Sequence, residues 1–75
     1  MKNVKKIIYY TIARGHRGAQ IYLDKGLFMR DIKNYANPKY KIFSNRIESL
    51  CYLKLHGVNI MEIEPIGLLS YLKKN

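Results

Sequence analysis

Residues 13–20, ARGHRGAQ, contain the side chains that a polyanion-binding site requires. Arg14, His16 and Arg17 fall within four positions, and the glycines at 15 and 18 would let the backbone approach a ligand closely. An arginine guanidinium binds phosphate through two parallel hydrogen bonds, and backbone N–H groups add to that grip. The alternative interpretation is a solvated turn, because exposed loops tolerate charge. We favour the first interpretation because the surrounding half of the chain is strongly basic.

The charge of the chain is large and unevenly distributed. Its 75 residues include 14 Lys and Arg against 5 Asp and Glu, a formal net charge of +9 at pH 7. Positions 1–43 hold ten basic and two acidic residues, whereas positions 44–75 hold four and three. Excess lysine that serves only solubility explains the total better than it explains the clustering. The pattern therefore predicts a polyanionic partner.

Two segments around this motif predict a β-hairpin. Lys5–Ala13 and Ala19–Asp24 are rich in β-branched and aromatic residues, which favour strands. Pairing Ala13 with Gly18 leaves a four-residue loop, Arg14–Arg17, and gathers the apolar side chains on one face. A shift by one residue would mix polar side chains among them, so the burial pattern favours this register.

Tyrosines are the second candidate class, with seven in the chain and no tryptophan. In the predicted register Tyr9 lies opposite Tyr22 on the more polar face, and Tyr10 belongs to the core. Tyr9 and Tyr22 could stack on unpaired bases, as aromatic residues of sheet-based RNA binders do. The alternative is a cross-strand aromatic pair that stabilises the hairpin by about 0.2–1 kcal/mol. Tyr35 and Tyr40, which lie among lysines, are weaker stacking candidates.

Further basic residues could extend the hairpin tip into a track that attracts a polyanion in a salt-dependent manner. Most of its members would be individually dispensable. The candidate nucleic-acid-binding residues are Arg14, His16, Arg17, Lys5, Lys6, Tyr9, Tyr22, Lys25, Arg30, Lys33, Lys39 and Lys41.

Residues 45–56 predict the main helix. Asn45 followed by Glu48 is an N-cap pattern, Ser44 is a competing cap, and Gly57 suits the position just after the helix. The residues at helical spacing that should face the core are Ile47, Leu50, Cys51 and Leu55.

The other segments predict less regular elements. Leu27–Ile32 could be a third, edge strand or a short helix that ends before Pro38, and Asn37–Lys41 is expected to be a loop. Val58–Ile63 predicts a closing strand, and residues 65–73 predict a short C-terminal helix. That helix could complete the core, which we favour in so small a chain, or form a homodimer.

These elements predict a single α+β domain over residues 1–75. A small antiparallel sheet, made of the N-terminal hairpin and a closing strand near 58–63, is packed by the main helix and the short C-terminal helix. A chain of this length buries only about 60% of its unfolded surface, so it can build one small core.

Catalytic and metal-binding patterns are not evident in the sequence. His16, His56 and Cys51 lack the paired spacing of metal ligands, and Ser44 and Ser49 lack a base with an orienting partner. Ribonuclease chemistry at His16 would need a second proton-transfer group. We therefore expect no enzyme activity, no metal and no cofactor. The lone Cys51 is expected to be a small core residue.

The chain also lacks the patterns of membrane or export segments. Its apolar runs are far shorter than the roughly 20 residues that cross a bilayer, and its N-terminus does not resemble a signal peptide. A single cysteine gives no reason to expect an oxidising compartment. We expect a cytoplasmic protein without a membrane partner.

A hairpin followed by YKIFSNRIESLCYLKLHG and VNIMEIEP resembles small accessory proteins of lytic bacteriophages, over roughly residues 7–64. The resemblance implies a host-takeover or counter-defence factor in the host cytoplasm, and it assigns no site residues. The residues predict a nucleic-acid-binding protein, with RNA favoured over DNA, and the resemblance implies that it counteracts a host nuclease, toxin or defence system together with RNA. The alternative is a protein–protein inhibitor whose basic face covers an acidic or nucleic-acid-binding surface of a host protein.

Overall fold

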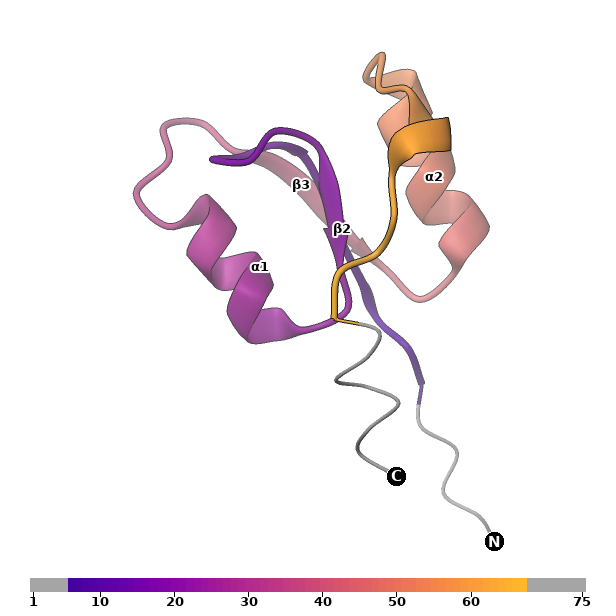
Figure 1. Cartoon of the computed structure of the whole chain (residues 1–75), viewed down its shortest axis with the longest axis horizontal. Coiled ribbons are helices and arrows are strands. Elements are labelled where there is room, and N and C mark those ends of the chain that lie inside the picture. Colours follow the sequence, from indigo (N-terminus) through magenta and orange to yellow (C-terminus); the bar gives the residue numbers. More distant parts are fainter. Residues whose placement is uncertain (1–5, 68–75) are drawn as a thin grey trace, which may run out of the picture.

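A computed structural model describes residues 6–67 of the chain. These residues form a three-stranded antiparallel sheet of order β2-β1-β3 that lies between two helices (Figure 1). This confirms the predicted α+β class and the N-terminal hairpin. The elements are β1 (Tyr9–Arg14), β2 (Gln20–Tyr22), α1 (Lys25–Ile32), β3 (Lys39–Phe43), α2 (Arg46–Leu55) and the short 3₁₀ helix η1 (Ile60–Glu62).

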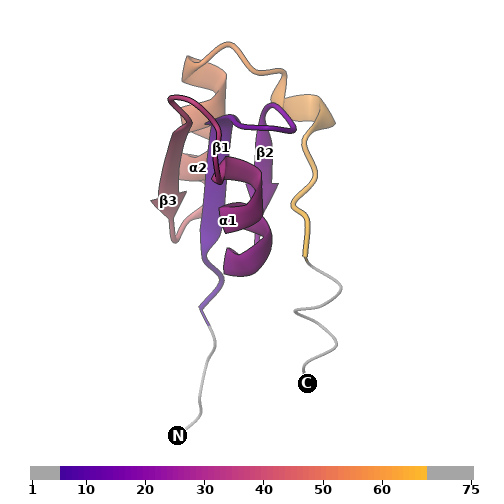
Figure 2. The ribbon, with the colours of Figure 1, turned by 90° about the vertical axis from the view of Figure 1, so that its left-hand side faces the viewer.

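Alternation along the central strand divides the core into two halves. Tyr10 and Ile12 point toward α1, where Tyr10 stacks on Phe28 with ring centroids 5.0 Å apart. Thr11 points the other way and shares a buried hydrogen bond with Ser49 of α2. Successive side chains of a strand point to opposite faces, so one strand can hold a helix on each side. The helices lie on opposite sides of the sheet in Figure 2.

The hairpin register differs by one residue from the prediction. The observed partners are Tyr10 with Tyr22 and Thr11 with Ile21, instead of Tyr9 with Tyr22. The shift moves Tyr22 to the face of Tyr10, where only 3% of it is exposed. The polar–apolar pattern was misleading because the Tyr22 hydroxyl has a buried hydrogen-bond partner, Asp31. A polar group that is satisfied in the core need not lie on the solvent face.

The ambiguous segment after the hairpin is a helix, α1. The Asp24 side chain accepts a hydrogen bond from Leu27 N at 3.1 Å and thereby caps its first turn. The chain leaves the helix through Asn34 and Asn37, both with φ near +60°. Asparagine tolerates this left-handed conformation better than most residues.

The third strand of the sheet is β3, where a loop was expected at positions 37–41. Its residues are mostly exposed, because β3 is an edge strand that pairs only with β1. Lysines at 39 and 41 are typical of an edge strand, where charge discourages pairing with another chain. The loop prediction relied on the Asn37–Pro38 signal, which marks only the start of the strand.

Helix α2 begins and ends as predicted. The Asn45 side chain accepts from Glu48 N at 3.1 Å, and Gly57 follows the helix with φ +80°. The predicted core face was wrong, however, because Ser49 and Leu53 are fully buried and Ile47 is 70% exposed. None of the other residues predicted for that face is buried either: Leu50 is half-buried, Leu55 is 86% exposed and Cys51 is exposed.

The C-terminal part of the described chain contains no closing strand at 58–63. This region instead holds η1 and an extended segment that runs beside β2 (Figure 2). Backbone hydrogen bonds join Ile66 to Leu23 and Ile21, at 2.8 and 2.9 Å. Residues 65–67 are not helical, and the remainder of the expected helix at 65–73 lies outside the described residues.

Candidate nucleic-acid interface

The hairpin tip is a tight turn that contacts the end of α1. Gly18 N donates to Gly15 O at 3.0 Å, and Gly18 has φ +79°. A Cβ on Gly15 would lie 3.0 Å from both the Asp31 carboxylate and the Ile12 side chain. Glycine at this position therefore lets the turn pack closely against the helix.

A buried carboxylate holds the tip against α1, and we call its hydrogen bonds the Asp31 network. Arg17 N donates to Asp31 Oδ1 at 3.0 Å, and the Tyr22 hydroxyl donates to Asp31 Oδ2 at 2.6 Å. His16 N donates to the backbone oxygen of Asp31 at 3.1 Å. Asp31 is only 5% exposed. The network fixes the positions of the tip residues relative to α1.

Burial raises the pKa of Tyr22 to about 12, and the hydrogen bond and negative charge of Asp31 act in the same direction. The positive charge of Arg17 partly opposes this increase. The Tyr22 hydroxyl therefore remains protonated at neutral pH and donates to Asp31. This role is incompatible with Tyr22 as an exposed stacking surface, so that site prediction was wrong.

Four segments bring basic side chains to the tip, at the end of the sheet where β1 ends and β3 begins (Figure 1). Arg14 is the cross-strand partner of Lys39. His16 Nε2 lies 2.7 Å from the backbone oxygen of Lys33. The group, which we call the basic end, comprises Arg14, His16, Arg17, Arg30, Lys33 and Lys39.

The other predicted site residues do not join the basic end. Lys25 lies at the opposite end of α1, and Tyr9 pairs with Phe43 at the far end of β1. Lys6 precedes that end of β1, and Lys41 is placed over the Phe43 ring, 5.7 Å from its centroid. Lys5 lies outside the described residues. The expected continuous track along the hairpin is therefore a compact group at one end, drawn from the end of β1, the loop, α1 and β3.

Two other tyrosines lie closer to the basic end than Tyr9 does. The Tyr35 ring meets His16 edge to face, with centroids 5.1 Å apart. Tyr40 packs edge to face against Phe28 at 5.2 Å and remains 44% exposed. Tyr40 is thus an accessible aromatic side chain in the strand that carries Lys39.

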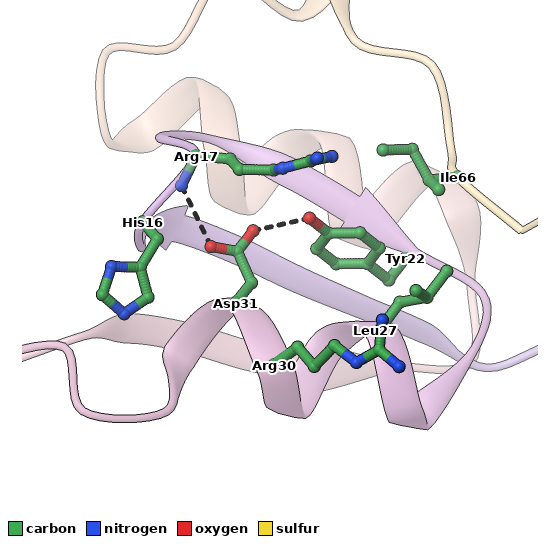
Figure 3. Close-up of a pocket in the computed structure, with 7 residues that line it drawn as sticks. All are labelled: His16, Arg17, Tyr22, Leu27, Arg30, Asp31 and Ile66. Atoms are coloured by element: carbon green, nitrogen blue, oxygen red, sulfur yellow. Dashed lines mark hydrogen bonds between the residues drawn. The ribbon is translucent and has the colours of Figure 1, made fainter.

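A pocket of about 250 Å³ opens between the tip and α1 (Figure 3). The side chains of Arg17 and Arg30 extend on two sides of it, and the Tyr22 hydroxyl and the Asp31 carboxylate lie between them. The lining residues are His16, Arg17, Tyr22, Leu27, Arg30, Asp31 and Ile66.

Sequence reasoning did not identify Asp31, Leu27 or Ile66 as parts of the site. One signal for Asp31 was available, since it is the only acidic residue between positions 25 and 47 in a basic half of the chain. An isolated carboxylate among cations often has a structural partner. Ile66 carried no such signal, because its place in the pocket depends on pairing with β2.

No protein family, curated protein or solved structure matches this chain. Within residues 6–67, no helix is long and apolar enough to cross a membrane. The same part of the chain holds no group of three or more His, Cys, Asp or Glu side chains that could bind a metal ion.

Proposed function

We propose that this protein binds nucleic acid, with single-stranded RNA favoured over DNA, through the basic end. The observation that carries the proposal is that Arg14 and Lys39, two exposed cations, are backbone partners at the end of the sheet, just after a shift in the β1–β3 register between Ile12 and Arg14. Like charges on neighbouring strands repel each other. A phosphate backbone that lies across both strands would neutralise the two cations. Loss of their mutual repulsion would then favour the bound state.

The neighbouring charges support the same partner. Arg17, Arg30 and Lys33 add three more cations, and Asp31 is the one acidic member of this surrounding group. Asp31 is buried, and both of its carboxylate oxygens already accept hydrogen bonds within the protein. The remaining acidic residues of the described chain lie elsewhere: at the start of α1 (Asp24), in α2 (Glu48) and near the C-terminal segment (Glu62 and Glu64).

The preference for a single strand has two supports. Tyr40 packs on Phe28 at the α1 face of the sheet and remains 44% exposed, and aromatic rings bind unstacked bases without strong sequence preference. Neither helix presents a row of basic side chains of the kind that reads the major groove. The preference for RNA now depends on Tyr40 and Tyr35, because Tyr22 is buried.

The test compares two double variants with the same change in charge. R14Q/K39Q removes the cross-strand pair, and K25Q/K54Q removes two exposed lysines outside the basic end. Binding of a short single-stranded RNA would be followed by fluorescence anisotropy from about 50 to 200 mM salt. If each replaced residue contacts one phosphate, R14Q/K39Q should lower the slope of log K against log salt by about 1.4. The control should leave the slope nearly unchanged.

Two results would contradict the proposal. Equal losses in both double variants would show that only the net charge matters. Absence of binding to either RNA or DNA at about 50 mM salt would reject nucleic-acid binding altogether. That second result would favour the alternative, in which the basic end covers an acidic surface of a host protein. The phage role remains a prediction from the resemblance alone.

A further inference from the structure

The pocket within the basic end is lined by two chemically different kinds of side chain. Arg17 and Arg30 supply two guanidinium groups, whereas Leu27 and Ile66 supply a half-buried apolar wall. Figure 3 shows the guanidinium groups of Arg17 and Arg30 extending to the same side of the pocket as Leu27 and Ile66, away from His16. Binding to a continuous phosphate backbone would use only the first of these features.

The charged side chains favour an anion although a carboxylate lies among them. Each Asp31 oxygen already accepts a hydrogen bond, from Arg17 N and from the Tyr22 hydroxyl. The two guanidinium groups outnumber this single carboxylate, so the pocket carries a net positive charge with His16 neutral. Guanidinium groups match the geometry of phosphate oxygens.

The apolar side chains of Leu27 and Ile66 and the volume of the pocket favour a ligand larger than a phosphate ion. A cavity of about 250 Å³ is larger than a phosphate ion needs. A phosphate alone would leave the wall formed by Leu27 and Ile66 in contact with water. A purely apolar ligand would make no use of the Arg17 and Arg30 guanidinium groups. A nucleotide has both an anionic group and a flat, largely apolar base.

We propose that this pocket binds one unpaired nucleotide of a single strand. Its phosphate lies between the guanidinium groups of Arg17 and Arg30, and its base lies against Leu27 and Ile66. The inference rests on the proposed function for the identity of the strand. It adds a physical reason for the strand preference, because bases in a duplex are stacked and must be extruded to enter a pocket.

The first test compares R30Q with K25Q, since both residues are exposed and both belong to α1. R30Q should weaken binding of a single-stranded RNA about tenfold, as expected for loss of a charged hydrogen bond, and should change duplex binding much less. K25Q should have a small and equal effect on both. Circular dichroism would verify that both variants are folded. If R30Q and K25Q weaken binding of single-stranded RNA equally, the inference that the pocket binds a nucleotide fails.

The second test titrates the whole protein with small molecules that can occupy only the pocket. The separate probes are adenosine 5′-monophosphate, adenosine and inorganic phosphate. The nucleotide should shift the backbone amide NMR signals of the pocket residues at lower concentration than either fragment. If inorganic phosphate binds as tightly as the nucleotide, the site is only an anion site and the inference fails. Unchanged pocket signals with the nucleotide would also overturn it.

These tests separate the pocket from the proposed function. Arg14 and Lys39 do not line the pocket, so R14Q/K39Q tests the basic end without altering it. If R14Q/K39Q lowers the salt dependence while R30Q behaves like K25Q, the proposed function stands and the pocket inference fails. If neither RNA nor DNA binds but the nucleotide shifts the NMR signals of the pocket residues, the pocket is a site for a free nucleotide. The proposed function and the assignment of that nucleotide to a single strand then both fail.

Discussion

The two helices are held on opposite faces of one sheet by different interactions. Helix α1 contributes a buried carboxylate, Asp31, which accepts hydrogen bonds from the tip and from Tyr22. Helix α2 contributes the neutral Ser49–Thr11 pair and the fully buried Leu53. The α1 face uses charge to position the basic side chains around it, whereas the α2 face depends mainly on burial.

This difference teaches where the site and the stability of the molecule reside. A charged buried group costs much to desolvate, so it is retained where it orders a specific geometry. Here that geometry is the tip turn with Arg14, Arg17 and their neighbours. Helix α2 buries no charged side chain against the sheet, and its exposed apolar residues, Ile47 and Leu55, contribute little to the fold.

The largest effect is expected when the apolar contact of α2 is removed. L53A deletes a side chain with no exposed surface and should lower the free energy of unfolding by about 2–5 kcal/mol, through lost burial and the cavity left behind. L55A, on the same helix but 86% exposed, should change it by no more than about 0.5 kcal/mol. Urea unfolding of both variants measures the difference. Similar losses would mean that the burial of α2 is assigned to the wrong face.

The second prediction compares the two polar anchors. D31A leaves the Tyr22 hydroxyl and Arg17 N without their buried acceptor and should cost about 2–3 kcal/mol. S49A removes a neutral hydrogen bond to Thr11 and should cost about 1 kcal/mol. Urea unfolding gives both values. D31A should also increase hydrogen exchange at the amides of residues 15–18. A larger cost for S49A would reverse the comparison.

Local features of α2 could be predicted from the sequence, whereas its orientation on the sheet could not. The helix of residues 45–56 and its caps could be predicted, because Asn45, Glu48 and Gly57 act locally. Its orientation could not, since a small polar residue, Ser49, is buried against Thr11 and the larger apolar residues are exposed. Apolar periodicity ranks residues by type and cannot anticipate a polar partner on another strand.

The candidate site shows the same limit. The sequence identified the cations of the tip, because charge and glycine are visible without a fold. It did not identify the pocket, which needs Asp31 from α1 and Ile66 from beyond α2. The register depended on this hidden pairing, since the buried Tyr22 hydroxyl donates a hydrogen bond to Asp31. Long-range polar contacts were therefore the main source of error.

The smallest effect concerns alkaline pH and compares one tyrosine from each side. The pKa of Tyr22 is raised to about 12 by burial and by Asp31, and burial alone raises the pKa of Tyr52 in α2. The unfolded chain loses the Tyr22 proton near pH 10, before the folded protein does. Stability from this group is therefore complete below pH 10 and is lost progressively as the pH rises toward 12.

Urea midpoints measured from pH 8 to pH 11 would test this dependence in the wild type, Y22F and Y52F. Each substitution removes one titrating hydroxyl, and slopes are compared because Y22F also loses a hydrogen bond at neutral pH. Y22F should remove more of the alkaline decline than Y52F, because the negative charge of Asp31 adds to the effect of burial only at Tyr22. If the two variants flatten the decline equally, Asp31 does not act on Tyr22 in the folded protein, and the contrast between the two faces is lost.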